Sequence, residues 1–291
     1  MARLKPILAI VVLYKMHFSA SPSYGTLNAA LRERAELASK IDLLVVDNSP
    51  EAQATPADFC GRYVHDGTNS GLASRYNYAL REAVAGGATW LLLLDQDTTL
   101  TDGYLDELAE LSTRLAGEET IAIVAPKLID VNTLQSPHLP RYRRSEYALD
   151  LQSYGVLGGL VRAYNSGAML RVSALQAIGG FPEAYWLDYL DHATMHQLQV
   201  RGGQVYLTQA RLQHEMSIHR ADKHEDPAHA ERHRNQLRAE IRFYREFGSV
   251  QERLWHRASL AKQALRSARD GFPAEAMRLM RAAVAVGMVK E

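Results

Sequence analysis

The chain has 291 residues, of which 47% are hydrophobic and 23% charged, a balance typical of folded globular proteins that excludes extensive disorder. Lysine plus arginine and aspartate plus glutamate both number 33, so the net charge is zero and no global field would attract nucleic acid. Cys60 is the only cysteine, which excludes intramolecular disulfides and favours a reducing compartment, the cytoplasm.

The first segments predict a βαβ unit. Residues 6–14 form a continuous, largely β-branched apolar run, which is typical of a central parallel strand and too short to span a bilayer. Residues 23–37 have the spacing of a crossover helix, and residues 41–46 predict the next strand. A right-handed crossover puts both strand ends at one edge of the sheet. Asp47 is therefore expected beside a ligand crevice, where it either contacts a nucleotide base or ribose or serves as a turn residue.

A loop with glycines follows the third predicted strand. Residues 62–65 predict that strand, and a helix is expected at residues 72–84. Asn69 and Gly71 of the loop tolerate positive φ, and the N-terminus of the following helix favours anions, so the loop suits a phosphate-bearing ligand. It has neither the dinucleotide-binding pattern nor the Walker pattern. Asn77 lies one to two turns into the helix, from where a polar side chain can reach back to the crevice.

The most informative stretch is an apolar run that stops at two acids. Residues 90–94 are five large apolar residues in a row, which predicts a strand buried on both faces. Asp95 and Asp97 then lie at its carboxyl end, where open α/β sheets bind ligands. Their oxygens suit a hard divalent cation on a diphosphate. The alternative is a polar turn that caps the next helix.

The second half of the chain predicts shorter elements. The pattern indicates a helix from Thr101 or Asp102 to Leu115, strands at residues 121–125 and 165–170, and a helix at residues 172–178. Residues 130–155 lack a clear period and carry prolines and a basic cluster, so they predict a long functional loop on the acceptor side. The basic cluster consists of Arg141, Arg143 and Arg144.

A second acidic cluster lies within residues 181–200. On a helix, Asp188, Asp191 and His192 are spaced i, i+3 and i+4 and share one face. A partly buried carboxylate there can serve as a general base. The alternative is that these acids only complement the positive end of the helix dipole.

The chain continues with a last strand and a helical region. Residues 204–207 predict the strand, and His214 beyond it is either a further cation contact or a surface histidine. Residues 229–291 are helical in pattern, and from residue 251 onward 8 lysines and arginines face 4 acids, a local net charge of +4. Such helices either lie peripherally on an anionic membrane surface, here the cytosolic face of the inner membrane, or pack on the rest of the chain or on a second subunit.

The order of these features resembles the family 2 inverting glycosyltransferases over about residues 6–220. The resemblance rests on Asp47 at a strand end, Asn69-x-Gly71, the leucines before Asp95-Gln96-Asp97, Gly179-Gly180-Phe181 before the acidic cluster, and Gly202-Gly203 after it. Within that family, Asp-Gln-Asp combined with Asp188-Tyr-x-Asp191 is most similar to bacterial rhamnosyltransferases that use dTDP-L-rhamnose.

The resemblance implies an α/β nucleotide-sugar-binding fold, called GT-A, with a mostly parallel central sheet over residues 1–220 and a helical C-terminal appendage over residues 221–291. It implies a metal-dependent enzyme that moves a sugar, here L-rhamnose, from a nucleoside diphosphate to a saccharide or lipid-linked saccharide acceptor in cell-surface polysaccharide synthesis. A function of another class stays open on the same fold, a non-catalytic sugar-nucleotide-binding or scaffold protein, because Tyr189 replaces an acid of the family cluster.

The resemblance also implies roles for individual residues. Asp47, Asn69, Gly71, Asn77 and Asp95 contact the nucleotide, Asp97, Asp95 and His214 hold Mg²⁺ or Mn²⁺, and Asp191 or Asp188 is the base. One further departure from the family concerns Arg234-Asn235, which lacks the tyrosine pair that often precedes it in related rhamnosyltransferases. That departure leaves the acceptor class open.

Overall fold

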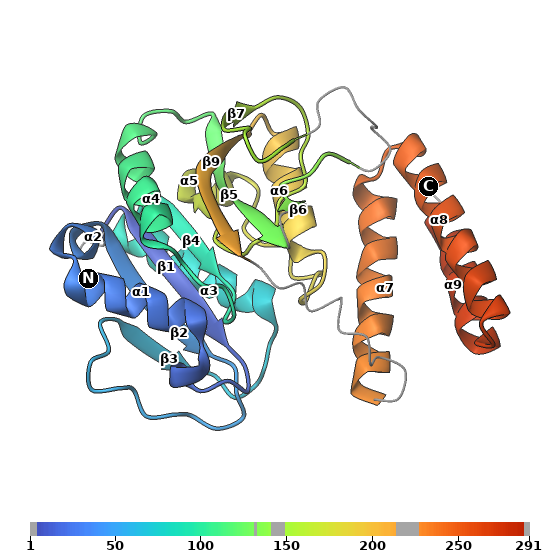
Figure 1. The fold of residues 1–291 in the computed structure, drawn as a ribbon, viewed down its shortest axis with the longest axis horizontal. Helices are drawn as coiled ribbons and strands as arrows, with labels where there is room; N and C mark the ends of the chain where they lie inside the picture. Colours follow the sequence, from blue (N-terminus) through green and yellow to red (C-terminus); the bar gives the residue numbers. More distant parts are fainter. Residues whose placement is uncertain (1–4, 131–132, 141–148, 214–226, 288–291) are drawn as a thin grey trace. The chain divides into compact units, whose positions relative to one another are not determined.

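The computed structural model describes residues 5–130, 133–140, 149–213 and 227–287, and in them nine strands form one sheet (Figure 1). The strands are β1 (Ile7–Leu13), β2 (Ile41–Asp47), β3 (Arg62–His65), β4 (Trp90–Leu94), β5 (Ile121–Asp130), β6 (Thr133–Ser136), β7 (Gly155–Leu157), β8 (Met169–Arg171) and β9 (Gln204–Gln213). The helices are η1 (Phe18–Ala20, a 3-10 helix), α1 (Pro22–Glu33), α2 (Ala35–Lys40), α3 (Leu72–Gly86), α4 (Asp102–Arg114), α5 (Val172–Ala177), α6 (Leu190–Val200), α7 (Pro227–Phe247), α8 (Val250–Arg269) and α9 (Pro273–Gly287).

The sheet has the strand order β3-β2-β1-β4-β8-β5-β9-β7, with β6 paired to β5. The four strands from β3 to β4 are mutually parallel, as the βαβ pattern predicted. Beyond them the sheet is mixed, because β8 runs antiparallel to both β4 and β5, while β5 and β9 are parallel. The predicted α/β fold with a mostly parallel central sheet is confirmed, and the antiparallel β8 is an addition to the prediction.

The continuous apolar strands are buried on both faces. Every residue of β1 and of β4 is buried. Alternate residues of β1, such as Ala9 and Val11, join a core with Leu27 of α1 and Leu108 of α4. α3 packs on β1 and β4 from its own buried residues, and α6 packs on β5 and β9. These two layers of helices explain why the strands lack the alternation of a half-exposed sheet.

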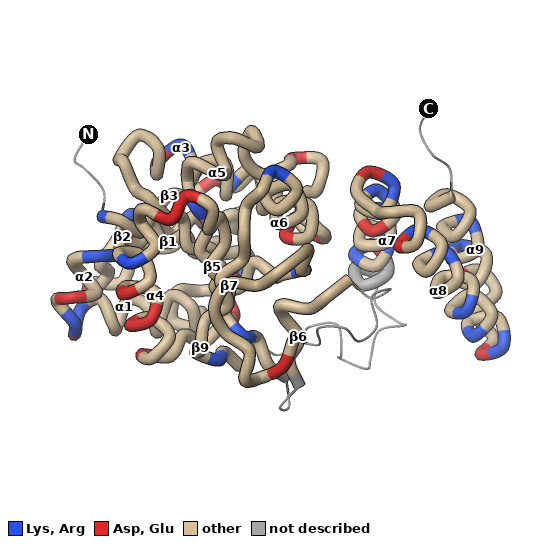
Figure 2. Tube along the Cα trace, turned by 90° about the horizontal axis from the view of Figure 1, so that it is seen from above, with Lys and Arg blue, Asp and Glu red and all other residues tan. Residues whose placement is uncertain are grey.

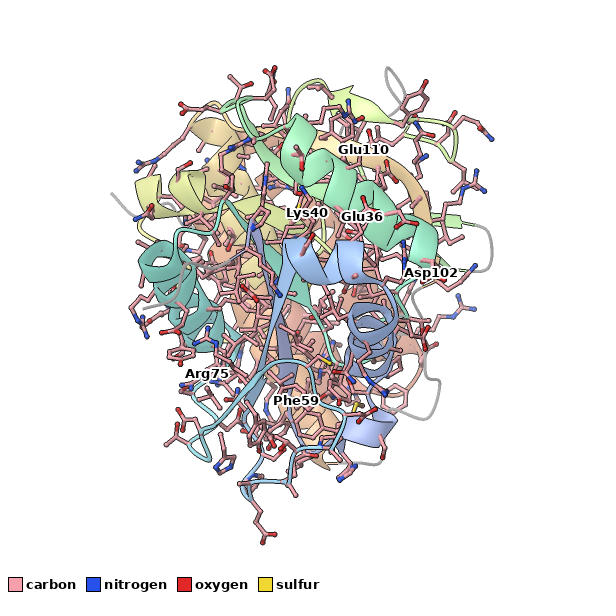
Figure 3. All side chains as sticks on the ribbon, turned by 90° about the vertical axis from the view of Figure 1, so that its left-hand side faces the viewer. Glu36, Lys40, Phe59, Arg75, Asp102 and Glu110 are labelled. Carbon is pink, nitrogen blue, oxygen red and sulfur yellow. The ribbon has the colours of Figure 1, made fainter. Side chains whose placement is uncertain are left out.

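Some elements differ from the sequence prediction. The helix expected at residues 23–37 is two helices, α1 and α2, separated at Arg34, whose backbone is extended. α2 lies against α4, where Lys40 donates to the Thr113 hydroxyl over 3.0 Å (Figure 3). Part of the predicted loop at residues 130–155 forms β6, which pairs with β5, so a loop over that whole range was wrong. The cluster Arg141, Arg143 and Arg144 lies outside the described residues.

The described residues divide into two compact units, one within residues 1–139 and 149–216 and one that is mainly residues 217–291. The second unit has a core of its own, formed between α7, α8 and α9 by residues such as Leu237, Leu260 and Leu279. The boundary predicted at residue 220 lies outside the described residues. No helix in the described ranges is long and apolar enough to cross a membrane.

A buried arginine on β8 lies beside the first residue of β4, at the end of that strand away from Asp95. Arg171 of β8 is 3% exposed, and its guanidinium donates to the carbonyls of Leu115, Glu118 and Ile121 over 2.7–2.9 Å and to that of Ala116 over 3.2 Å. It also stacks 4.3 Å from the Trp90 ring centre. A cation is favourable beside carbonyls that follow the C-terminus of α4. Arg171 thus joins β8, β5, β4 and α4.

We therefore expect Arg171→Met to destabilise the protein. The substitution removes four hydrogen bonds from a charged donor, each worth about 1.5–3 kcal/mol in a buried setting, so a total loss of about 3 kcal/mol or more is expected in urea unfolding. Arg81→Met is the matched control, because Arg81 is exposed on α3 and should change stability by less than about 0.5 kcal/mol. Equal effects of the two substitutions would contradict the structural role of Arg171.

Candidate active site

The carboxyl ends of four neighbouring parallel strands meet at one edge of the sheet. β1 pairs with β2 and β4, and β2 also pairs with β3. In this register Leu13 is opposite Asp47, and Asp47 is opposite His65. Asp95 directly follows β4. Asp47 and Asp95 therefore flank β1 at the edge where open α/β sheets bind ligands.

Asp47 is fully buried and bonded to protein donors. Its carboxylate accepts hydrogen bonds from the Ser49 backbone N, from Gln53 Nε2 and from the Tyr63 hydroxyl, each over 2.9 Å. Burial alone raises the pKa of Asp47, but the hydrogen bonds from Ser49, Gln53 and Tyr63 outweigh burial and lower this pKa below its ordinary value. This is the environment of an ionised turn residue, and a base contact by Asp47 stays a prediction.

The next residue, Asn48, was not singled out from the sequence. It is 3% exposed, and its backbone N donates to the Leu13 carbonyl over 2.8 Å. Its side-chain Oδ1 is buried and has no hydrogen-bond partner among the described residues. A buried amide oxygen without a donor costs about 1–3 kcal/mol, which a ligand with an N–H group would recover. Its position directly after a parallel strand was the available sequence signal.

The loop after β3 has the positive φ angles that its sequence predicted. Asn69 has φ +44° and Gly71 has φ +90°. Asp66 forms an ion pair with Arg75 of α3 over 2.6 Å and accepts hydrogen bonds from the backbone N and hydroxyl of Thr68. Figure 3 labels Arg75 beside this loop. The ion pair ties the loop to the first turns of α3, whose N-terminus favours anions.

Gly71 allows this loop to touch the segment that carries the second acidic cluster. A Cβ atom at Gly71 would lie 2.2 Å from the Trp186 ring. The backbone N of Leu72 donates to the Trp186 carbonyl over 2.8 Å. Any side chain at position 71 would therefore displace Trp186, which lies two residues before Asp188.

α3 is attached to the same segment a second time, through Asn77. Its Nδ2 donates to the Phe181 carbonyl over 2.9 Å, and its Oδ1 accepts from the Phe181 backbone N over 2.8 Å. Gly180 makes room for this contact, since a Cβ there would lie 2.6 Å from Asn77 Oδ1. Both polar groups of Asn77 are thus bonded to protein, and its contact with a nucleotide stays a prediction.

The turn after β4 presents one acid to the protein and one to solvent. The Asp95 carboxylate accepts a hydrogen bond from the Ser166 hydroxyl, and the Asp95 carbonyl accepts one from Ser23. Gln96 Oε1 accepts from the Tyr14 backbone N over 2.9 Å. Asp97 is exposed and forms no hydrogen bond or ion pair with a described residue. Its carboxylate is available to a ligand.

These two acids fit a magnesium or manganese ion that is shared with a ligand. Carboxylate oxygens are the donors that such hard cations prefer. In the described ranges no three His, Cys, Asp or Glu side chains form a metal site by themselves. Mg²⁺ commonly uses one or two carboxylates together with waters and phosphates, so two acids suffice. His214, the third predicted ligand, lies outside the described residues.

The start of α6 differs from the prediction. The helix begins at Leu190, and Tyr189 before it has φ +61°, in the left-handed region. The interpretation that Asp188 shares a helical face with Asp191 and His192 was therefore wrong, because a left-handed residue interrupts the helical spacing. Asp191 lies in the first turn of α6, and Asp188 precedes the helix.

Asp191 is fixed by its neighbour His192. Its Oδ1 accepts from the His192 backbone N over 2.7 Å and lies 3.2 Å from His192 Nδ1. Burial raises the pKa of Asp191. The interactions with His192, and then with His138, outweigh burial and lower this pKa below its ordinary value. The carboxylate is therefore ionised at neutral pH.

The His192 ring lies in a cluster of aromatic rings. It stacks on Tyr164 with a centroid distance of 5.7 Å and an interplanar angle of 10°. The rings of His138 and Tyr189 meet it edge to face at 6.1 Å and 5.0 Å. These contacts fix the imidazole, and with it the orientation of Asp191.

Tyr76 of α3 lies in the field of both acids. Its side chain is fully buried, and its hydroxyl has no hydrogen-bond partner among the described residues. Burial, followed by the charges of Asp95 and Asp191, raises the pKa of Tyr76 well above its ordinary value. The hydroxyl therefore stays protonated as a donor. Nothing in the sequence singled out Tyr76, because a tyrosine on the buried stripe of a helix is usually a core residue.

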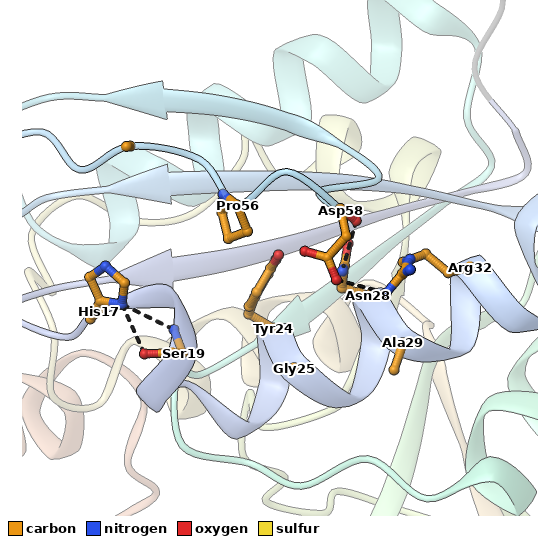
Figure 4. A pocket seen from close by; sticks show the side chains of 10 residues that line it. His17, Ser19, Tyr24, Gly25, Asn28, Ala29, Arg32, Pro56 and Asp58 are labelled. Carbon is orange, nitrogen blue, oxygen red and sulfur yellow. Dashed lines mark hydrogen bonds and ion pairs between the residues drawn. The ribbon is translucent and has the colours of Figure 1, made fainter.

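A pocket of ≈ 540 Å³ lies beside α1 and the segment after β2 (Figure 4). Its lining includes the ion pair between Arg32 and Asp58, 2.7 Å apart, and Tyr24, whose buried hydroxyl has no partner in the described part of the chain. None of the predicted site residues lines this pocket, so it is separate from the acids at the strand ends.

Residues 24–179, more than half of the chain, match the family model described as Glycosyl transferase family 2. Among solved structures, S. aureus TarS 1-349, alone and in complex with UDP, is 14% identical with a TM-score of 0.49, covering 99% of this chain and 93% of that chain. The catalytic domain of Drosophila beta1,4galactosyltransferase 7 in complex with xylobiose is 15% identical with a TM-score of 0.42, covering 78% of this chain and 79% of that chain. No curated protein sequence matches this chain.

Asp47 should make stability depend on pH. Its folded pKa is below the unfolded value of 3.8, so its contribution is fully present above that value and is lost as the pH falls through the folded pKa. We expect Asp47→Asn to unfold in less urea than the wild type at pH 7, with a difference that shrinks below about pH 4. Asp97→Asn, at an exposed acid, is the control and should show no such trend. A difference independent of pH would contradict the assignment.

Proposed function

This chain belongs to Glycosyl transferase family 2, and from that premise we propose that it is an inverting enzyme that moves L-rhamnose from dTDP-L-rhamnose to a saccharide acceptor. The family match makes the chain a glycosyltransferase that uses a nucleotide-sugar donor. The observation that carries the proposal is geometric: Asp95 follows β4 at the carboxyl ends of the parallel strands, and α3 is bonded through Leu72 and Asn77 to the segment that leads to Asp191. One acid follows a donor-side strand and the other begins an acceptor-side helix.

The donor nucleotide would lie at the carboxyl ends of the parallel strands. The unpartnered Oδ1 of Asn48 is suited to accept the ring N–H of a thymine or uracil base. The loop around Asn69 and Gly71, with the N-terminus of α3, would face the diphosphate. The choice of dTDP-L-rhamnose rests on the resemblance of Asp95-Gln96-Asp97 and Asp188-Tyr-x-Asp191 to rhamnosyltransferases.

Asp97 and Asp95 would hold Mg²⁺ or Mn²⁺ at the diphosphate. Asp97 supplies an exposed carboxylate, and Asp95 is oriented by the Ser166 hydroxyl. When bound, such a cation neutralises the negative charge of the leaving diphosphate.

The acceptor hydroxyl would be deprotonated by Asp191. Its oxygen attacks the anomeric carbon from the face opposite the diphosphate, the bond to the diphosphate breaks, and the hydroxyl proton passes to the carboxylate. One displacement inverts the anomeric centre, so no covalent sugar intermediate forms. Asp191 is preferred over Asp188 because its carboxylate is ionised and fixed by His192.

Nucleotide binding tests the donor half of this proposal. We expect isothermal titration with dTDP and with UDP, each with Mn²⁺, to show tighter binding of dTDP. Asp97→Ala should weaken the metal-dependent binding and abolish turnover, whereas Asp102→Ala, at an exposed acid of α4, should do neither. If neither nucleotide binds, the proposal fails. If the wild type turns over in excess chelator with metal shown absent, the metal part fails.

The assignment of the base predicts a separation of binding from turnover. Asp191→Asn should bind the nucleotide normally. Its rate of sugar transfer to the acceptor, followed as nucleotide released from the nucleotide-sugar donor, should fall by about 10² to 10⁴. Asp188→Asn should be affected less. An inactive Asp188→Asn beside a nearly normal Asp191→Asn would exchange the two roles, and two active variants would place the base elsewhere. A wild type that binds dTDP but never consumes donor would favour the non-catalytic alternative.

A further inference from the structure

The second compact unit exposes large apolar side chains on two adjacent helices. α8 and α9 pack against each other around Leu260 and Leu279. On their outer surface Leu265 is 72% exposed, Leu254 57% and Val284 58%. Val250, Met277 and Met280 are also exposed. Apolar residues gathered in this way on two helices point to a contact surface.

These side chains lie on the side of α8 and α9 that faces away from α7. His256 marks the α7 side of α8, because it stacks on Tyr244 at 4.1 Å and lies 3.5 Å from Glu240. With about 100° of rotation per residue, Leu254 and Leu265 are roughly 160° and 180° from His256. Glu275 marks the α7 side of α9 through His233, 3.6 Å away. Met280 and Val284 are roughly 140° and 180° from Glu275. Both helices therefore direct apolar residues to one side of the unit.

The same two helices carry an excess of positive charge. From residue 250 to 287 there are seven lysines and arginines and three acids, and Lys and Arg segments recur along α8 and α9 in Figure 2. Glu275 forms an ion pair with Arg278, which leaves six basic residues against Asp270 and Glu252, the latter in a capping box with Ser249. The basic residues therefore determine the charge of this surface.

Basic residues flank the apolar side chains of α8. Arg253 is roughly 100° to one side of Leu254, and Lys262 and Arg269 are roughly 60–80° to the other. None of these three forms an ion pair with a described residue. Long basic side chains beside an apolar stripe can reach the lipid headgroups while the stripe enters the acyl region, which is the pattern of helices that lie in a membrane interface.

We propose that α8 and α9 dock this chain on the surface of an anionic lipid membrane through the face around Leu254, Leu265, Met280 and Val284. The positive charge selects anionic headgroups, and the apolar side chains supply contact area. The helices lie in the interface and do not cross it, as no described helix is long and apolar enough to do so. The inference does not depend on the donor or on the reaction.

Vesicle co-sedimentation of the full chain tests the proposal. We expect binding to vesicles that contain phosphatidylglycerol, weaker binding to pure phosphatidylcholine, and a decrease with added salt. Leu254→Glu with Leu265→Glu should reduce binding at least about ten-fold, because two apolar side chains no longer enter the lipid. Asn235→Glu with Gln263→Glu adds the same charge at exposed positions elsewhere on the unit and should reduce binding much less.

A second pair of substitutions tests the charges without touching the apolar residues. Lys262→Gln with Arg269→Gln should weaken binding to the phosphatidylglycerol vesicles by about five-fold per residue, equivalent to about 1 kcal/mol each. Circular dichroism of each variant checks that it folds. Absence of wild-type binding, or equal binding of the Leu254/Leu265 variant and its control, would overturn the proposal. A face that instead mediates self-association, seen by analytical ultracentrifugation without vesicle binding, would also overturn it.

Discussion

The close contact between Gly71 and Trp186 is the constraint on which the arrangement of the acids depends. The ring of Trp186 occupies the space that a side chain at position 71 would fill, and Leu72 bonds to the Trp186 carbonyl. The loop after β3 is thereby joined to the segment before α6. Because that segment leads directly into Asp188 and Asp191, the absence of a side chain at position 71 affects where these two acids lie.

Asn77 makes α3 the common support of both halves of the site. Its amide clamps the backbone of Phe181, while Tyr76, one residue earlier, packs its ring 5.1 Å from the Phe181 ring and turns its hydroxyl into the field of Asp95 and Asp191. A single helix therefore carries the attachment and the buried hydroxyl. Rotation of α3 would change both at once, which makes its fixed packing on β1 and β4 part of the site.

The sequence predicted the features that depend on local pattern and missed those that depend on distant contacts. The runs that became β1 and β4 were recognisable because burial on both faces leaves no polar residues, and Asp47 and Asp95 follow from where such strands end. The antiparallel pairing of β8 was not predictable from a period, because it joins segments far apart in the chain. The left-handed backbone conformation of Tyr189 was not predictable either, because that conformation is rare for a residue other than glycine.

The low pKa of Asp191 places a condition on the proposed chemistry. A carboxylate with a pKa below its usual value is a weak base, so it cannot remove a proton from a free hydroxyl at the start of the reaction. The hydroxyl becomes much more acidic once its oxygen bonds to the anomeric carbon. In the proposed displacement, most of the proton transfer would then follow formation of the bond to the anomeric carbon. In the proposed reaction Asp191 would act until that point as an ionised hydrogen-bond acceptor that His192 keeps in one orientation, so its position would contribute more than its basicity.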